Sequence, residues 1–179
     1  MNPFTAPEIL EAWDQVVKTC TDACTDFSED AFHQSRNGKW SAAQNLEHLI
    51  KSTEPLTQGL GMPLLALKAM GKPNRPVRDY ETVVGRYKEK LAAGGVSTSR
   101  YEASGAPGTK AELLQKWEQA TRNLAAVMRD KWQDEARLDR ILLPHPLLGK
   151  LMVREMLLFT IYHTQHHTQA ILRQKELVD

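Results

Sequence analysis

Three separate segments of this chain carry the same helix-start signature, a Ser or Thr followed three residues later by Glu or Gln. In this arrangement each of the two side chains accepts a hydrogen bond from the backbone N–H of the other position. The segments are residues 5–8, 41–44 and 109–112. Each is followed by apolar residues at three- and four-residue spacing, which predicts an amphipathic helix. The fold is therefore expected to be built mainly from packed helices.

The apolar stripes give the extent of these helices. We predict the first over about residues 7–24, the second from residue 41 through 56 and the third from residue 109 through 128. A fourth is expected to begin after Gly149 and to continue to about Arg173. Cys20 and Cys24 lie on the first stripe, where they are expected to fill core space as small apolar groups.

A long connection, residues 59–108, separates the second and third predicted helices and contains most of the glycines. Within it, residues 62–70 suit a short apolar helix, residues 79–93 an amphipathic one and residues 95–108 a loop. A connection this long usually covers something. No convincing strand pattern appears. We therefore expect an all-α four-helix bundle with a long connection between helices 2 and 3, in a single domain spanning residues 1–179.

Charge and hydropathy argue against several function classes. The chain has 23 Lys and Arg residues against 22 Asp and Glu residues, with no basic block, so no nucleic-acid partner is expected. The N-terminus lacks the pattern of a signal peptide, and no apolar run approaches the ~20 residues of a membrane span. We expect a cytoplasmic protein without a membrane partner.

The strongest chemical signal is the run His163-Thr-Gln-His-His167 in the fourth helix. Two histidines four residues apart project from one helix face, where two imidazoles can share a metal ion. His163 alone would suit a hydrogen-bonded core histidine, but its partner His167 favours a metal site. His48 is the weaker candidate, because it lies off the apolar stripe of its helix, near Asn45 and Ser52.

Three segments together resemble the DinB-like superfamily of metal-binding four-helix bundles. They are Trp40-Ser41 with the following Asn45-Leu-Glu-His48, the run His145-Pro-Leu-Leu-Gly149, and the histidine pair with Gln169. The chain departs from many relatives at Thr168, where an arginine is common.

The resemblance implies that His48, His163 and His167 bind a divalent metal ion, zinc, nickel or iron. It also implies a thiol-dependent S-transferase, isomerase or hydrolase that uses a small thiol, of the mycothiol or bacillithiol type, and an electrophilic substrate. Three imidazole ligands leave a coordination position open, as in catalytic sites. The alternative is a metal-binding stress-response or scaffold protein without catalytic activity, acting through a helical dimer interface.

A homodimer is expected because the first half of the fourth helix is apolar almost all round, which requires either full enclosure or a second subunit.

Several other residues have weaker assignments. We expect His166 to pack beside the site, and Glu47 and Gln169 to orient an imidazole or to be solvated. His33 and His145 are expected in exposed loops, with a pocket mouth as the alternative for His145 because it belongs to a family-like motif. The tryptophans are expected to serve as core and capping residues; they are Trp13, Trp40, Trp117 and Trp132.

Two related chemistries are excluded by spacing. A carboxylate-bridged di-iron bundle needs Glu-x-x-His pairs on two helices, and this chain has none. A zincin protease needs Glu directly after the first histidine of the pair, where this chain has Thr164.

Overall fold

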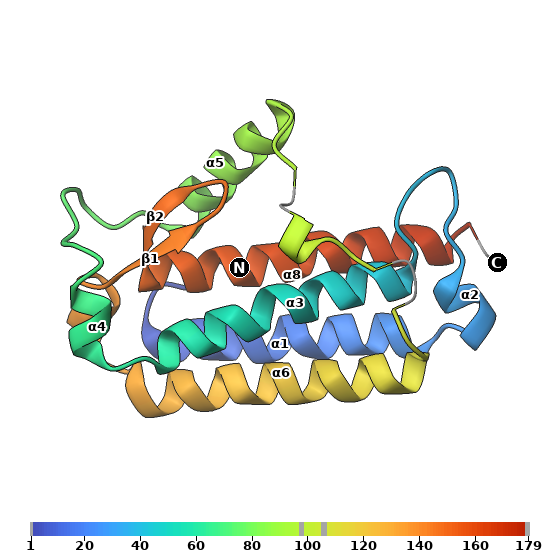
Figure 1. Ribbon diagram of the computed structural model, residues 1–179, viewed down its shortest axis with the longest axis horizontal. Helices are drawn as coiled ribbons and strands as arrows, with labels where there is room; N and C mark the ends of the chain where they lie inside the picture. Colours follow the sequence, from blue (N-terminus) through green and yellow to red (C-terminus); the bar gives the residue numbers. More distant parts are fainter. Residues whose placement is uncertain (1, 97–98, 105–106, 178–179) are drawn as a thin grey trace.

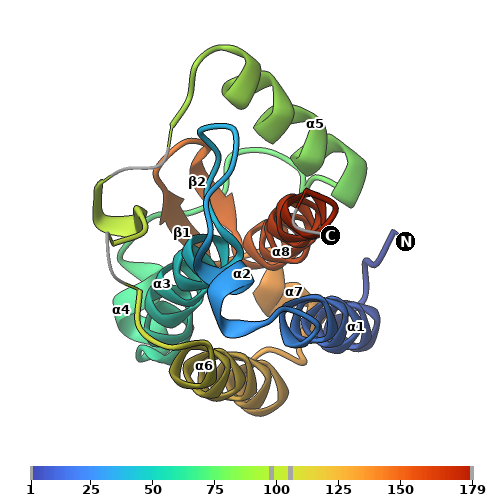
Figure 2. The same cartoon turned by 90° about the vertical axis from the view of Figure 1, so that its right-hand side faces the viewer.

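The computed structural model describes residues 2–96, 99–104 and 107–177 (Figure 1). Its body is formed by four long helices, α1 (Ala6–Thr25), α3 (Ala42–Gly61), α6 (Lys110–Lys131) and α8 (Val153–Lys175). Seen along the bundle, they pack in the cyclic order α1, α6, α3, α8 (Figure 2). The predicted all-α four-helix bundle is confirmed.

Capping boxes begin three of these helices, as the sequence predicts. In each box, the Ser or Thr hydroxyl accepts a hydrogen bond from the backbone N–H three residues later. The Glu or Gln side chain at that later position accepts one from the backbone N–H of the Ser or Thr. The pairs are Thr5–Glu8, Ser41–Gln44 and Thr109–Glu112. A cap of this kind stabilises a helix by about 1 kcal/mol. These helix starts are therefore fixed by residues close in the sequence.

The space between the helices is filled by aromatic and small apolar side chains. The rings of Trp13 and Trp117 meet edge to face with centroids 6.2 Å apart, and the Trp132 indole N–H donates to the carbonyl of Leu60. All three tryptophans are buried, as predicted. Cys20 and Cys24 are fully buried free thiols, which confirms their assignment to the core.

The connection between α3 and α6 contains α4 (Leu64–Lys68), α5 (Tyr80–Ala92) and a 3₁₀ turn η1 (Ser99–Tyr101). Both helices predicted there are confirmed. Figure 2 shows α5 outside the four-helix ring, where it packs on α8. The predicted loop over residues 95–108 includes η1; its residues 97–98 and 105–106 lie outside the described residues.

A two-stranded antiparallel hairpin precedes α8 and corrects the predicted start of the fourth helix. Strands β1 (Leu142–His145) and β2 (Gly149–Met152) pair in register Leu142 to Met152, and α8 begins only at Val153. Gly149 has φ +75°, a conformation that glycine adopts without strain and that does not continue a helix. Strands of four residues are too short to show a clear alternation of apolar and polar side chains. Met152 also fits the apolar stripe of the helix, so the periodicity predicted a helix start that is too early.

Two short helices complete the described elements, α2 (Glu29–His33) and α7 (Glu135–Leu138). His33, predicted in a loop, is the last residue of α2. Its imidazole lies 3.2 Å from the carboxylate of Glu29, one turn earlier.

The first half of α8 is enclosed within this one chain. Every residue from Val153 to Ile161 is buried, because α1, α3, α5 and the hairpin all pack against this helix. Enclosure therefore explains the apolar sequence, and the homodimer stays a prediction. Among the described helices, none combines the length and apolarity needed to cross a membrane.

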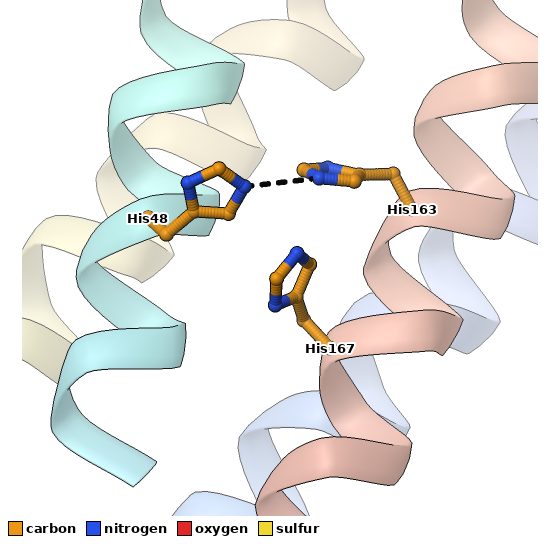
Figure 3. Close-up of side chains that lie close together, drawn as sticks. All are labelled: His48, His163 and His167. Carbon is orange, nitrogen blue, oxygen red and sulfur yellow. Dashed lines mark hydrogen bonds between the residues drawn. The ribbon is translucent and has the colours of Figure 1, made fainter. Parts of the chain in front are cut away.

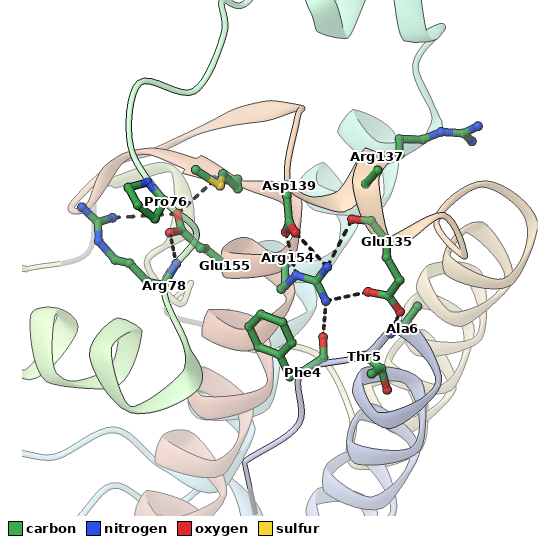
Figure 4. Close-up of polar contacts among 12 residues, drawn as sticks. Phe4, Thr5, Ala6, Pro76, Arg78, Glu135, Arg137, Asp139, Arg154 and Glu155 are labelled. Atoms are coloured by element: carbon green, nitrogen blue, oxygen red, sulfur yellow. Dashed lines mark hydrogen bonds and ion pairs between the residues drawn. The ribbon is translucent and has the colours of Figure 1, made fainter.

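Two buried charged residues at the start of α8 hold distant segments together (Figure 4). The Arg154 guanidinium donates to both carboxylate oxygens of Asp139, at 2.6 and 3.0 Å, pairs with Glu135 at 2.7 Å and donates to the carbonyl of Phe4. The N-terminal segment, α7 and the residues before β1 are thereby fastened to α8.

The neighbouring Glu155 carboxylate fastens the long connection. It accepts from the Arg75 guanidinium at 2.5 and 2.6 Å and from the backbone N–H groups of Arg78 and Met152 at 2.9 and 3.0 Å. Burial alone would raise the pKa of Glu155, but these hydrogen bonds and the Arg75 charge outweigh it and hold the pKa below its ordinary value.

Candidate metal centre

Three histidine rings converge between α3 and α8 (Figure 3). His48 projects from α3, and His163 and His167 project from one face of α8 because they are four residues apart. The three ring centroids lie 4.5 to 4.9 Å from one another. The structure therefore brings together all three histidines that the sequence and the resemblance singled out.

The nitrogen atoms of this group suit a shared metal ion. One ring nitrogen from each histidine lies within 4.8 Å of the others, and the Nε2 atoms of His48 and His163 are 3.0 Å apart. Ligands about 2.0–2.1 Å from a tetrahedral zinc ion are roughly 3.3 Å from each other, so small ring movements suffice. A hydrogen bond now joins the two nitrogens of His48 and His163, and a cation would replace its proton.

Two outer contacts orient the rings. The Nδ1–H of His48 donates to the backbone carbonyl of Tyr101 at 2.5 Å, and the Nδ1–H of His167 donates to the Asn45 side-chain oxygen at 2.8 Å. Each bond places the proton on Nδ1 and leaves Nε2 with a lone pair toward the group. Metal-binding histidines in proteins are held in this way.

The site keeps its imidazoles uncharged. Burial is the main cause that lowers the pKa of His48, His163 and His167, and the neighbouring histidines lower each further. For His48 the bond to Tyr101 opposes this shift without cancelling it. Neutral imidazole is the form that binds metal ions, so at neutral pH no proton has to be expelled from an imidazolium.

A cavity of about 590 Å³ opens onto the three histidines. Its walls are mainly apolar and come from α3, α5, the hairpin and α8. They include Leu56, Tyr87, Leu91, Leu143, Leu147, Met156 and Phe159. Burial raises the pKa of Tyr87 to about 12, so its hydroxyl stays protonated at neutral pH. Among the described lining residues, Arg100 is the one side chain with a permanent charge.

Two predicted neighbours line the cavity beside the group. Trp40, half-buried, packs its indole against His48 and His167, with centroids 5.3 and 6.2 Å away. The prediction of a core or capping role for Trp40 thus missed its place in the site. His166 lies beside His167 and lines the cavity, outside the group of three, in agreement with its predicted packing role.

The two other polar candidates, Glu47 and Gln169, do not contact the three imidazole rings. Glu47 accepts from the backbone N–H and the hydroxyl of Ser104 and pairs with Lys51, so it holds the segment after η1 and touches no imidazole. Gln169 is exposed, which agrees with a solvated position and excludes it as a partner of the three rings.

His145 differs from the exposed loop position that was expected first. It ends β1, is half-buried and lines the cavity, which agrees with the alternative position at a pocket mouth. Its ring meets Phe159 edge to face at 4.3 Å, and burial lowers its pKa to about 4. The resembling His-Pro motif was the one signal that pointed to this position.

The fold and the site together define a helical bundle with an internal three-histidine group suited to a metal ion. The sequence model of the DinB superfamily matches residues 8–171. The chain therefore belongs to the DinB superfamily, which confirms the resemblance. No curated protein matches the sequence.

Proposed function

We propose that this protein is a metal-dependent enzyme in which His48, His163 and His167 bind one zinc, nickel or iron ion. A small-molecule thiol would react there with an electrophile held in the cavity, by S-transfer, isomerisation or hydrolysis. The observation that carries the proposal is that the cavity reaches all three imidazoles. Among the described residues no fourth His, Cys, Asp or Glu joins the group, whereas structural zinc sites use four protein ligands.

The metal ion and the protein contribute different parts of the chemistry. A bound divalent ion supplies Lewis acidity, which lowers the pKa of a coordinating thiol and favours the thiolate near neutral pH. Tyr101 and Asn45 hold two imidazoles in the ligand-ready tautomer. The apolar walls of the cavity bind the electrophile and keep bulk water from it.

Metal content tests the site. Chelator-treated protein is reloaded with Co²⁺, zinc or nickel, and the bound metal is measured beside His48→Ala and His163→Ala. We expect about one ion per chain in the wild type and loss in both variants, because two imidazoles bind far more weakly than three. His166→Ala is the matched control, a cavity histidine outside the group, and it should retain the ion.

Thiol titration of the cobalt-loaded protein tests the chemistry. A thiolate-to-cobalt absorption band that appears with 2-mercaptoethanol supports an open coordination position and justifies a screen of electrophiles. Metal that stays bound without a spectral change would instead favour the non-catalytic metal-binding protein. Absence of metal after reloading would refute the site altogether.

Sedimentation equilibrium of the same samples measures whether the proposed homodimer forms.

A further inference from the structure

His145 is held by hydrogen bonds from its own hairpin turn. The backbone N–H groups of Leu147 and Leu148 lie 3.2 and 3.1 Å from its Nδ1 atom and donate to it. A ring nitrogen accepts only through a free lone pair, so Nδ1 carries no proton. The proton of the neutral imidazole is therefore on Nε2, and the turn fixes this tautomer.

The ring stays neutral in its surroundings. Protonation of Nδ1 would remove the acceptor of both turn N–H groups and leave them facing an N–H. Burial acts in the same direction, lowering the pKa of His145 to about 4. His145 is thus an uncharged donor throughout the physiological pH range.

The Nε2–H group has no acceptor among the described residues, whose hydrogen bonds to this ring all use Nδ1. Because His145 lines the cavity and its Nδ1 edge is taken up by the turn, the donor belongs to the cavity side. This nitrogen is not among the buried unpaired atoms of the described residues, so it is open to the cavity and to water. An acceptor atom on a bound ligand can take the place of that water.

The donor is one aromatic ring away from the candidate metal centre. The Phe159 ring meets His145 edge to face at 4.3 Å and stacks on His163 at 5.2 Å, both measured between centroids. A ligand lying against Phe159 can therefore reach both the donor and the three-histidine group. Met156 and Leu147, also in the cavity wall, offer apolar contact.

We propose that the Nε2–H of His145 binds the substrate directly, and that the substrate class is an apolar molecule carrying one acceptor oxygen, such as a ketone. Its description as a substrate rests on the proposed function. The hydrogen bond itself requires no metal ion and can be tested without one.

The test uses metal-free protein and cyclohexyl phenyl ketone labelled with ¹³C at the carbonyl. Hydrogen bonding lowers the carbonyl stretching frequency, so infrared difference spectra report the donor directly. We expect a band below the hexane position in the wild type. His145→Asn should return the band to the hexane position. Its side-chain oxygen can replace Nδ1 as the acceptor in the turn, and its NH₂ group then lies near the Cδ2 position of the lost ring, short of where Nε2–H donates. Ketone affinity should fall about 3- to 10-fold.

His145→Phe and His166→Phe complete the set. The first removes the ring nitrogens but keeps an aromatic side chain, and it should match His145→Asn; the second removes another cavity histidine and should match the wild type. A lowered band that persists in both His145 variants would overturn the proposal, as would an unshifted band or no ketone binding in the wild type. Because metal is absent throughout, these outcomes are independent of whether the three-histidine site binds an ion.

Discussion

Asn45 connects the start of α3 to the candidate metal centre. Its side-chain oxygen accepts from His167 Nδ1–H, and its amide nitrogen donates to the carbonyls of Ser41 at 2.8 Å and Trp40 at 3.2 Å. Because the amide is anchored on both sides, its oxygen has one orientation toward the imidazole. The orientation of the His167 ring therefore depends on Asn45, which is not one of the three candidate ligands.

We predict that Asn45→Ala weakens metal binding without abolishing it. Loss of the acceptor frees the His167 ring to rotate and to change tautomer. Removing a hydrogen-bond partner of a metal ligand in this way lowers metal affinity by about 10- to 100-fold. Competition with a chromophoric chelator measures the change. Asn123→Ala, on the exposed face of α6, should leave the affinity unaltered. Equal affinities for all three proteins would contradict the assigned role.

Spacing within one helix made part of the site predictable. His163 and His167 share a face whatever the tertiary structure, so their pairing could be read from the sequence. His48 could not be placed by periodicity, since it lies off the apolar stripe, and its position came from the resemblance. The contact that orients it is the backbone carbonyl of Tyr101, 53 residues away, which no side-chain pattern encodes.

Among the elements, the part of the long connection just before α5 is held by one buried carboxylate. Glu155 is fully buried and receives Arg75 and the backbone of Arg78, just before α5 begins. Since α5 contributes Tyr87 and Leu91 to the cavity, this ion pair positions one wall of the site.

We predict that Glu155→Gln lowers the free energy of unfolding by about 2 kcal/mol at pH 7, as expected for lost hydrogen bonds to a charged group. The pKa of Glu155 is lowered in the folded state, so the unfolded state binds the proton more readily. The stabilisation is thus complete above the ordinary carboxyl pKa of about 4.3 and is lost as pH falls through the folded pKa.

Urea unfolding followed by circular dichroism between pH 3 and 7 measures this difference. The difference in free energy of unfolding between the wild type and Glu155→Gln should become smaller as the pH falls. Glu118→Gln is the control, because its carboxylate is exposed and, within the described part of the chain, pairs with Arg122 alone. It should change the free energy of unfolding by less than about 0.5 kcal/mol. A gap that is constant over the whole pH range would show that the Glu155 charge is not responsible.

Elements were predictable where their signals are local. The capping boxes and stripes of α1, α3 and α6, and the Asp79 cap of α5, lie within each helix itself. The hairpin before α8 was missed because its strands are four residues long and stabilised by pairing and by packing on α8. His145 was misplaced for the same reason, as its burial comes from that packing.

For the whole molecule, Arg154 is the point at which the N-terminal segment meets the start of the last helix. Only 1% of its surface is exposed, and it contacts the N-terminal segment through Phe4, α7 through Glu135, and Asp139. Glu135 and Asp139 both belong to α7 and its C-terminal cap, whereas Phe4 lies far from them in the sequence. The guanidinium therefore joins two distant segments to the start of α8.

We predict that Arg154→Ala destabilises the protein by about 3–5 kcal/mol, the usual loss when one partner of a buried ion pair is removed. Arg154→Lys should lose less, because it keeps the charge but not the two-pronged contact with Asp139. Thermal unfolding measures both variants. Arg122→Ala, whose side chain is 75% exposed, should unfold almost like the wild type; an equal effect of both alanine variants would contradict this role of Arg154.

The placement of α5 and the hairpin outside the four-helix ring has a consequence for how such a protein can diversify. The candidate metal ligands reside on α3 and α8, whereas much of the cavity wall is supplied by segments that contribute none of them. Exchange of residues 62–93 or of the hairpin between relatives would then alter which molecules are accepted, while the ligand helices and the Tyr101 carbonyl that orients His48 stay in place. Recombination and laboratory grafting therefore have natural boundaries in this chain, at the end of α3 and the end of α5.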